Sequence, residues 1–329
     1  MSPPTVLTVI LNYRTAEMTL RATRAALRAM DGVAGEVIVV DNASGDGSEA
    51  RLRAALEGTP GVRVIQAGHN GGFGAGNNVG IRAGLAATPR PDHVYLLNSD
   101  AFPEPGTIAA LRDHLDAHPR AGMVGSHVYG TDGATHVTAF RFPSARSEFE
   151  TAACTGPISR LLRRHIVAPP PPKSTTAVDW LSGCSLMLRA RMLDRIGLFD
   201  EGFFLYFEET DLCRRAAADG WERVYLPQVG VEHVGSLSTG MGAWARTPGY
   251  WFDSRWRYFA KHHGRAGAVL STLAHLAGGV LWRLRCAIQR RTDVGTPHFL
   301  RDLVRHMLTG APRPDPHRRD SAPRQTSSG

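Results

Sequence analysis

The stretch EVIVVDNASGDGS, residues 36–48, contains the pattern that decides the fold. Its first five residues, Glu36–Val40, form a short run rich in β-branched side chains, which is typical of a strand buried on both faces. Asp41 follows directly, so we expect its carboxylate at the carboxyl edge of a sheet, where it could accept hydrogen bonds from a base or a ribose. The same letters (Asp, Asn, Ser and Gly) are also typical of a turn, and this segment alone does not separate the two interpretations.

Strands and helices alternate on both sides of this stretch. The further strands we expect are Val6–Leu11, Val62–Gln66 and His93–Leu97, and the helices are Ala16–Met30, Ser48–Leu56 and Asn77–Ala87. This alternation predicts an α/β fold with a mostly parallel sheet and helices on both of its faces. Ligands of such sheets bind beyond the carboxyl ends of the strands. Polar clusters follow three of the predicted strands: Asn12-Tyr13-Arg14, Asp41-Asn42 and Asn98-Ser99-Asp100.

A glycine-rich segment, HNGGFGAGNNVG at residues 69–80, follows the third predicted strand. We expect a loop over Gly68–Gly76 that leads into the helix at Asn77, because glycines let a backbone approach a ligand and helix-opening amides attract negative charge. A dinucleotide-binding fingerprint fits poorly, since Asn77 stands where a glycine is required and the segment does not follow the first strand. A loop that serves only as a turn is the alternative.

Three carboxylates lie close together in FDEGFFLYFEETDLCRR, residues 199–215. Glu208, Glu209 and Asp211 follow an aromatic run, at the start of a short helix predicted over Thr210–Asp219. Helix capping is one interpretation, because the helix dipole favours acids in a first turn. Glu208 and Asp211 are three residues apart and share a helix face, whereas Glu209 points elsewhere. A carboxylate beside an aromatic wall is also a good general base, since partial desolvation raises its pKa.

The pattern changes along the second half of the chain. The alternation weakens after residue 120, and Ala168–Lys173 (APPPPK) marks a loop. Asp179–Leu188 is again a strand-like run, and from Gly249 onward the pattern is helical, aromatic and basic. We therefore predict three parts: a main domain over 1–245, a basic helical region over 246–310, and a disordered tail over 311–329 that is rich in Pro, Arg and Ser.

The net charge of +8 is concentrated in the C-terminal quarter. From Arg246 onward there are 15 Lys and Arg against 5 Asp and Glu, whereas residues 1–245 hold 23 against 25. The main domain therefore lacks the basic surface that a nucleic-acid-binding protein needs. Tryptophans among C-terminal arginines favour an anionic membrane surface as partner, with a solvated tail or an oligomer contact as alternatives. Ala266–Trp282 carries no formal charge over 17 residues, but its glycines and polar side chains favour a packed or surface-lying helix over a span.

Cysteine usage and the start of the chain bear on the compartment. The four cysteines include no C-x-x-C pair, which argues against a disulfide framework or a zinc knuckle and fits a reducing environment. MSPPTVLTVILNY has no basic region followed by a long apolar run, so we expect no signal peptide. These observations predict a cytoplasmic protein, peripheral on the inner face of the cell membrane.

Six segments, taken in order, resemble the GT-A glycosyltransferases of family 2, particularly the bacterial rhamnosyltransferase-like branch. They cover roughly residues 5–240 and are Asn12-Tyr13-Arg14, VVDNASGDGS (39–48), NGGFGAGNNVGI (70–81), LLNSDA (96–101), the long stretch from Trp180 to Arg215, and EHVGS (232–236). The resemblance implies a GT-A fold with a C-terminal helical extension. It also implies an inverting, metal-dependent transfer of a sugar from a nucleotide diphosphate donor, with dTDP-L-rhamnose as the leading donor. The implied acceptor is a glycan or lipid-linked saccharide of surface polysaccharide synthesis.

The resemblance further implies roles for individual residues. Glu209 would be the catalytic base, and Asp100 and His233 would hold Mg²⁺ or Mn²⁺, although a lone histidine such as His233 is also a common structural residue. Asp41 would hold the nucleobase, with Ser44 in the same pocket. The other implied donor-binding residues are Asn12, Tyr13, Arg14, Gly72, Phe73, Gly74, Asn77, Asn98 and Ser99. The implied acceptor-binding residues are Trp180, Gly183, Glu208 and Asp211.

Two departures from the family pattern keep other functions open. The family's D-x-D stands here as Asn98-Ser99-Asp100, so its first acid is missing and the affinity for metal is expected to be weaker. Glu209 replaces the usual aspartate, and its extra methylene moves the carboxylate by about an ångström, a displacement that can reduce a rate ~10²-fold. A non-catalytic nucleotide-sugar-binding relative is therefore one alternative. A nucleotidyltransferase is the other, but it needs a glycine-rich phosphate loop after the first strand, where Asn12-Tyr13-Arg14 supplies none.

Overall fold

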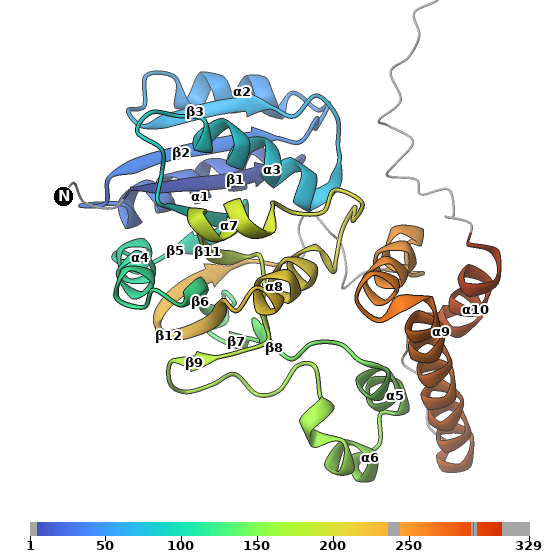
Figure 1. The fold of residues 1–329 in the computed structure, drawn as a ribbon. Helices are drawn as coiled ribbons and strands as arrows, with labels where there is room; N and C mark the ends of the chain where they lie inside the picture. Colours follow the sequence, from blue (N-terminus) through green and yellow to red (C-terminus); the bar gives the residue numbers. More distant parts are fainter. Residues whose placement is uncertain (1–4, 236–243, 291, 293–294, 311–329) are drawn as a thin grey trace, which may run out of the picture.

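A mixed sheet of ten strands forms the centre of the protein (Figure 1). The computed structural model describes residues 5–235, 244–290, 292 and 295–310, so the tail predicted over 311–329 lies outside the described residues. The first half of the described chain contains β1 (Val6–Asn12), α1 (Ala16–Ala29), β2 (Gly35–Asp41), α2 (Ser48–Leu56), β3 (Val62–Gln66), α3 (Gly72–Leu85), β4 (His93–Asn98), β5 (Ala101–Pro103), α4 (Thr107–Ala117), β6 (Ala121–Tyr129), β7 (Thr135–His136), β8 (Ala139–Phe140), α5 (Ala145–Ala153), α6 (Gly156–Leu161) and the 3₁₀-helix η1 (Arg163–His165). The second half contains β9 (Thr176–Ala177), β10 (Trp180–Leu181), β11 (Ser185–Arg189), α7 (Ala190–Ile196), α8 (Glu208–Ala218), β12 (Glu222–His233), α9 (Gly249–Gln289) and α10 (Phe299–Thr309).

The sheet is parallel at one side and mixed at the other. Its strand order is β3-β2-β1-β4-β11-β6-β12-β5, and the pairs β3–β2, β2–β1 and β1–β4 are all parallel. β11 runs antiparallel to both β4 and β6, and β12 runs parallel to β6. The run predicted over Asp179–Leu188 is therefore two strands rather than one. It breaks at residues 182–184, so that β10 pairs with β8 in a small separate sheet while β11 enters the main one.

Helices cover both faces of the sheet, which confirms the prediction made from the alternating pattern. Side chains of β1 alternate between two cores because successive residues of a strand point to opposite faces. Val6 and Ile10 pack in one core with α1, α2 and α4, whereas Leu7 and Val9 pack in a second core with α3, α7 and α8. A strand buried on both sides explains why Val6–Leu11 is apolar almost without interruption.

The start of α3 differs from the prediction. We expected a glycine-rich loop up to Gly76 and a helix from Asn77, but the helix begins at Gly72. Three of its glycines, Gly76, Gly80 and Gly84, are four residues apart and share one face, so they have a packing role: a Cβ atom added at any of them would lie within 2.6 Å of a β1 side chain. The glycines that suggested a ligand loop therefore let α3 approach β1 closely.

A helical lobe lies beside the sheet and is built from two separate parts of the chain (Figure 1). α5 packs along α9, and α10 packs against α9 as well. α9 is not straight, because Gly264 has φ 71° and ψ 169°, a conformation that essentially only glycine adopts. Arg255 and Thr272 would be ~25 Å apart along a straight helix of this length, yet their side chains are hydrogen-bonded at 3.0 Å. α9 therefore doubles back into two arms, 249–263 and 265–289.

One buried carboxylate holds the lobe together. Glu148 of α5 accepts hydrogen bonds from Arg255 (2.9 Å), which is on the first arm of α9, and it contacts His275 (2.8 Å) of the second arm. The side chain of Arg255 is 1% exposed. Burial alone would raise the pKa of Glu148, but the charge of Arg255 and the hydrogen bond from His275 lower it below its ordinary value.

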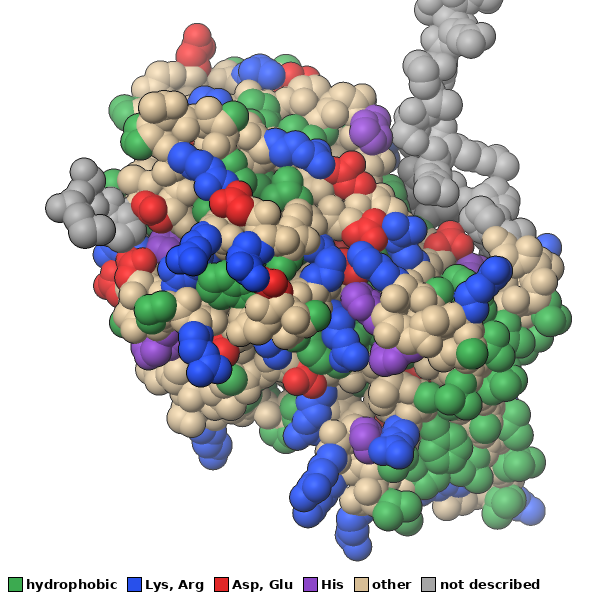
Figure 2. Space-filling model, in the orientation of Figure 1, with side chains coloured by type: hydrophobic (Ala, Val, Ile, Leu, Met, Phe, Trp, Pro, Cys, Tyr) green, Lys and Arg blue, Asp and Glu red, His purple; other side chains and the backbone are tan. Residues whose placement is uncertain are grey.

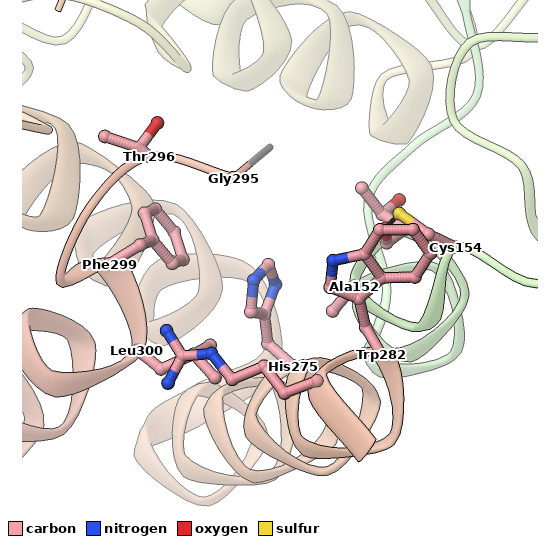
Figure 3. Close-up of a pocket in the computed structure, with 11 residues that line it drawn as sticks. Ala152, Cys154, His275, Trp282, Gly295, Thr296, Phe299 and Leu300 are labelled. Carbon is pink, nitrogen blue, oxygen red and sulfur yellow. Dashed lines mark hydrogen bonds between the residues drawn. The ribbon is translucent and has the colours of Figure 1, made fainter. Parts of the chain in front are cut away.

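A cavity of about 230 Å³ lies inside this lobe, between α5, α9 and α10. Figure 3 shows the side chains of His275, Trp282 and Phe299 around it, so its wall is mostly aromatic and apolar. None of the predicted site residues lines this cavity. Within the described part of the chain, every helix is too short or too polar to cross a bilayer.

Candidate active site

The carboxyl ends of β1, β2 and β4 meet at one edge of the sheet and bring three predicted polar clusters together. In the parallel registers, Asn12 lies opposite Asp41, and Asn98 lies opposite Leu11. The polar side chains at these positions come from segments that are up to 86 residues apart in the chain. The polar clusters that follow three of the predicted strands therefore lie at one edge of the sheet.

The Asp41 carboxylate is fully buried and hydrogen-bonded on both oxygens. Its Oδ1 accepts from Asn12 Nδ2 at 2.7 Å and from Ser44 Oγ at 2.5 Å. Its Oδ2 accepts from the Ser44 amide at 3.1 Å and from Gln66 Nε2 at 2.9 Å. Gln66 ends β3 in register with Asp41 and is exposed. Sequence reasoning missed Gln66, although its place at the end of the third predicted strand was a usable signal.

Tyr13 and Arg14 extend the same edge. The Arg14 amide donates to Ser44 Oγ, and its guanidinium Nε donates to the Ser44 carbonyl, both at 3.0 Å. The guanidinium also lies 5.1 Å from the centre of the Tyr13 ring. Arg14 has φ 57°, an uncommon backbone conformation for a non-glycine residue. These contacts fix the loop after β1 against the loop after β2.

Asp100 and His233 are neighbours across the sheet. β5 pairs antiparallel with β12 and sets His233 opposite Ala101, which places His233 Nε2 3.1 Å from Asp100 Oδ1 and 3.4 Å from Asn98 Nδ2. Burial alone would lower the pKa of His233, but the Cys184 sulfur and the Asp100 carboxylate raise it to about 10. Ser99 is nearby and accepts a hydrogen bond from Thr15 Oγ1 at 3.1 Å.

The donor set at Asp100 and His233 fits a divalent cation that takes its remaining ligands from a substrate. The described residues contain no group of three His, Cys, Asp or Glu side chains able to hold a metal by themselves. Mg²⁺ is usually bound through one or two carboxylates plus substrate phosphates, and Mn²⁺ accepts carboxylate and imidazole ligands. A carboxylate oxygen and an imidazole nitrogen side by side fit such an open site when the cation displaces the proton that Asp100 otherwise stabilises on His233.

The second cluster of acids lies at the start of α8. Glu208 and Glu209 open this helix directly after Tyr206 and Phe207, which have φ values of 69° and 68°. Two successive aromatic residues in this conformation are strained, and such strain concentrates at functional sites. The Oε2 atoms of both glutamates are buried without a hydrogen-bond partner.

Burial changes the acidity of both glutamates. It raises the pKa of Glu208 well above its ordinary value, and the neighbouring charge of Glu209 adds to the rise. Burial also raises the pKa of Glu209, although hydrogen bonds from the backbone amides of Glu209 and Gly183 oppose it. A carboxylate with a raised pKa and an unpaired oxygen is suited to accept a proton near neutral pH.

The start of α3 packs under this cluster. The Phe73 amide donates to the Phe204 carbonyl at 2.9 Å, and a Cβ at Gly72 would lie 1.7 Å from that oxygen. Gly74 faces the Cβ of Glu208, whereas the Asn77 side chain is buried and donates to the Phe73 carbonyl. Asn77 therefore lies inside α3, and the prediction that a helix opens toward an anion at this residue is wrong.

Gly183 borders the acids from the turn after β10, whereas Trp180 lies on β10 itself. A Cβ at Gly183 would lie 2.9 Å from the Phe73 ring, so glycine leaves just enough room there. Trp180 stacks on Phe140 at 4.0 Å between ring centres, and its Nε1 donates to the Arg141 carbonyl at 2.9 Å. The structure thus brings Gly183 beside Glu209 and leaves Trp180 partly exposed on the small sheet.

Asp211 has surroundings unlike those of the other predicted acceptor-binding residues. Its side chain is completely buried and contacts Arg215 on α8 (2.8 Å) and Lys261 and His262 on α9 (2.7 Å each). Burial would raise the pKa of Asp211, but the hydrogen bonds from His262 and Lys261 and the charge of Arg215 lower it. Asp211 therefore joins α8 to the first arm of α9 through these basic side chains.

Similarity to known proteins extends over most of this chain. Residues 3–260 match the family described as Glycosyltransferase like family 2. An N-acetylglucosaminyl-diphospho-decaprenol L-rhamnosyltransferase of Mycobacterium tuberculosis is 34% identical over 215 residues, which are 62% of this chain and 68% of the relative. The low-salt glycan biosynthesis hexosyltransferase Agl10 of Haloferax volcanii is 26% identical over 208 residues, which are 63% of this chain and 60% of that protein.

Two solved structures share the architecture. The mannosyltransferase PcManGT from Pyrobaculum calidifontis, solved in complex with GDP-Man and Mn²⁺, aligns with a TM-score of 0.58 at 17% identity and covers 94% of this chain and 88% of its own. GalNAc-T7, solved with UDP, GalNAc and Mn²⁺, aligns with a TM-score of 0.56 at 12% identity and covers 94% of this chain and 58% of its own. At these identities the likeness concerns the fold.

Proposed function

The chain belongs to glycosyltransferase family 2, and from this premise we propose that it is an inverting, metal-dependent rhamnosyltransferase with a lipid-linked saccharide as acceptor. That it is a glycosyltransferase with a GT-A fold follows from the family match and the sheet topology. L-rhamnose as the sugar, dTDP-rhamnose as its donor and the lipid-linked acceptor are proposals. They are supported by the mycobacterial relative, whose name specifies an L-rhamnosyltransferase acting with a diphospho-decaprenol acceptor.

One observation carries the mechanism: residues 183–184 touch both clusters of the site. The Cys184 carbonyl accepts a hydrogen bond from the Asn98 amide at 3.0 Å, beside Asp100 and His233. The adjoining Gly183 amide bonds to the Glu209 carboxylate. The candidate cation-binding pair and the candidate base therefore lie on either side of one turn, which supports a direct displacement at a single carbon.

The donor would lie along the edge of the sheet. Asp41 and Ser44 would hold the base, and the exposed Gln66 is the partner of Asp41 that a base N–H could replace. Asn12, Tyr13 and Arg14 would border the nucleoside, while Asn98 and Ser99 would lie next to the diphosphate. When bound at Asp100 and His233, Mg²⁺ or Mn²⁺ would neutralise negative charge on the leaving diphosphate.

The acceptor would approach from the side of Glu208, Glu209 and Gly183. Glu209 would take the proton of the attacking hydroxyl as the new carbon–oxygen bond forms and the bond to the diphosphate breaks. The inverted product follows from attack on the face opposite the leaving group. Glu208, whose pKa is raised by both burial and the charge of Glu209, would stay protonated and keep a second negative charge away from the reacting centre.

The proposed setting is surface polysaccharide synthesis at the cytoplasmic face of the cell membrane. A saccharide carried on a lipid diphosphate is confined to a bilayer, so the enzyme must work beside one. This setting rests on the acceptor class and not on the fold.

The test is a donor panel with purified protein. dTDP-rhamnose, UDP-glucose, UDP-galactose, UDP-N-acetylglucosamine and GDP-mannose are each added with Mn²⁺ or Mg²⁺ and then with a chelator, while thermal shift and released nucleotide are recorded. We expect stabilisation and slow, metal-dependent release with dTDP-rhamnose. Asp100→Asn should abolish the metal-dependent part, whereas Asp194→Asn, at an exposed ion pair with Arg90, should not. Release from another donor alone would refute the rhamnose proposal, and release that survives chelation would refute the metal.

A further inference from the structure

The exposed large hydrophobic side chains gather on the helical lobe. The described part of the chain has ten of them, and eight are on α9 and α10. They are Val269, Leu270, Leu273, Val280, Leu281, Leu284, Ile288 and Leu308. Figure 2 shows the corresponding apolar patch on the lower right of the molecule, over the place of α9 and α10 in Figure 1. Scattered apolar side chains are normal on a surface, but a contiguous patch marks an interaction site.

The seven residues on α9 form a single face of its second arm, 265–289. An α-helix turns about 100° per residue, so these side chains fall within an arc of roughly 120°. The opposite side of the arm is buried: Gly278 lies against α5, Gly279 lies against Leu300 of α10, and Cys286 is 5% exposed. The arm therefore has an inner face that packs against α5, α10 and the first arm, and an opposite apolar face that is exposed. We call the exposed one the outer face.

The charges around the outer face have one sign. By the rotation of about 100° per residue, Arg265 and Arg283 fall just before its arc and Arg285 just beyond it. Arg265 is exposed, whereas Arg283 lines the cavity inside the lobe and Arg285 donates to the Cys154 carbonyl at 3.3 Å. The sequence has no Asp or Glu between Asp253 and Asp293. Arginines at such a boundary can place their apolar stems along a hydrocarbon layer while their charged ends remain at its surface.

We propose that the outer face of α9 binds the surface of a bilayer that contains anionic lipid, with its leucines in the acyl boundary and its arginines among the head groups. This proposal rests on the proposed function, because a lipid-linked acceptor lies in such a bilayer. This arm does not span the bilayer, because its inner face packs against α5 and α10. It is also not apolar enough to cross a membrane. Apolar side chains on one side with a basic border are the features of a helix that lies in the membrane interface.

The face also connects to the candidate active site through the first arm of α9. Lys261 bonds to Asp200 (2.8 Å) and Asp211 (2.7 Å), which lie on either side of the strained Tyr206–Phe207 segment in the sequence. Arg257 reinforces the contact to Asp200 at 2.7 Å. Docking of the second arm therefore fixes the position of the carboxylates at the start of α8 relative to the bilayer.

The experiment measures co-sedimentation of the full chain with vesicles of phosphatidylcholine alone and with vesicles of phosphatidylcholine and phosphatidylglycerol in equal amounts. We expect binding to the anionic vesicles that weakens as salt is added. Leu273→Glu combined with Leu284→Glu should weaken this binding at least tenfold, because both side chains are on the outer face and half or more exposed. The matched control is Val137→Glu combined with Leu161→Glu, which adds the same charges at exposed hydrophobic residues elsewhere and should bind as the unmodified chain does.

Three results would overturn the proposal: no binding to anionic vesicles, equal loss in both double variants, or a lipid-independent dimer that only the outer-face variant dissociates. The last result would assign the face to a second copy of the chain. Donor hydrolysis without lipid, measured on the same preparations, separates this proposal from the proposed function. Hydrolysis without vesicle binding refutes only the docking, and vesicle binding with no hydrolysis from any donor refutes only the function.

Discussion

At the scale of single residues, the two glutamates that open α8 carry the clearest prediction. Replacing Glu209 by Gln keeps its shape and removes its ability to accept a proton. We expect kcat to fall by ~10²–10⁴-fold, the usual contribution of a general base, with little change in the thermal shift caused by the donor. The measurement is product formation under donor saturation, with Asp194→Asn as the exposed control.

Glu208→Gln tests the division of roles within the pair. If Glu208 stays protonated during turnover, this variant should retain most of the activity that Glu209→Gln loses. Equal loss in both variants would contradict Glu209 as the single base. Glu209→Asp adds a further comparison, because it restores the aspartate of the family pattern.

The pH dependence of the reaction follows from the environment of Glu209. Its pKa is raised above the ordinary value of 4.5 by burial, and only the ionised form can accept a proton. Activity should therefore be full at high pH and be lost as the pH falls through this raised pKa, so the acid limb of kcat should lie above 4.5. The Glu208 carboxyl is the titratable neighbour, and Glu208→Gln should leave the limb above that value because burial is the main cause. A limb at the ordinary value would show that Glu209 is solvated or is not the base.

The residues of the site were predictable where the signal was local. Asp41, Asn98 and Asp100 follow short apolar runs, and a strand-terminal position in a parallel sheet is sufficient to place them at one edge. The surroundings of Asp211 were not predictable, because its partners Lys261 and His262 are about fifty residues away on another helix. Spacing along α8 placed Asp211 on a helix face, but it held no information about what covers that face.

At the scale of elements, the close contact between α3 and β1 can be tested at Gly84. A Cβ at this position would lie 2.2 Å from the Leu7 side chain, which is fully buried. Gly84→Ala should reduce the free energy of unfolding by about 1–3 kcal/mol, the range for overpacked cores. Gly156→Ala is the control, since a Cβ added there would meet no atom within 4 Å and the backbone φ is unstrained; because Pro157 follows it, a small loss is expected, below that of Gly84→Ala. Chemical unfolding of both variants decides the point.

The buried pair of Glu148 and Arg255 makes a second element-scale prediction. Glu148→Gln leaves the guanidinium of Arg255 buried without its counter-charge, which should cost about 3–5 kcal/mol. Glu36→Gln breaks an exposed pair with Arg63 and should cost at most about 1 kcal/mol. The pKa of Glu148 is lowered in the folded protein, so its stabilising effect is present above the unfolded value of about 4.5 and is lost as the pH falls through the folded one. Unfolding curves across acid pH should show this loss in the unmodified chain and not in Glu148→Gln.

Element boundaries show why part of the fold escaped the sequence. The strands β1, β2 and β3 and the helix α2 agree with their predicted ranges to within a residue, because each has a clear apolar period and a clear turn beside it. The start of α3 was misplaced because glycine has low helix propensity, and the packing that compensates for it depends on β1. The break between β10 and β11 could not be predicted either. Ser182, Gly183 and Cys184 are compatible with a continuous strand, and the break depends on the pairing of β10 with β8, a strand about forty residues earlier.

At the scale of the whole molecule, charge and hydrophobicity are separated in space. The near-neutral sheet domain carries the candidate active site, while the basic helices carry most of the exposed apolar side chains. Composition alone predicted this division of charge, but it did not predict that α5, from the middle of the chain, belongs to the helical lobe. Contacts between segments more than a hundred residues apart, such as Glu148 with Arg255, have no signature in a single sequence.

The outer face of α9 has a kinetic consequence. An enzyme held on a bilayer meets a lipid-borne substrate by diffusion in two dimensions, where the effective concentration is set by the membrane and not by the bulk volume. Its rate should therefore follow the mole fraction of acceptor among the lipids. Diluting the acceptor with inert anionic lipid, at constant total acceptor, should slow the reaction, whereas diluting the vesicles with buffer should leave it nearly unchanged until the protein dissociates. In the double variant Leu273→Glu with Leu284→Glu the two effects should be exchanged. Dilution with buffer should slow this variant more than dilution with inert lipid, because it must bind a vesicle from solution before each encounter with acceptor.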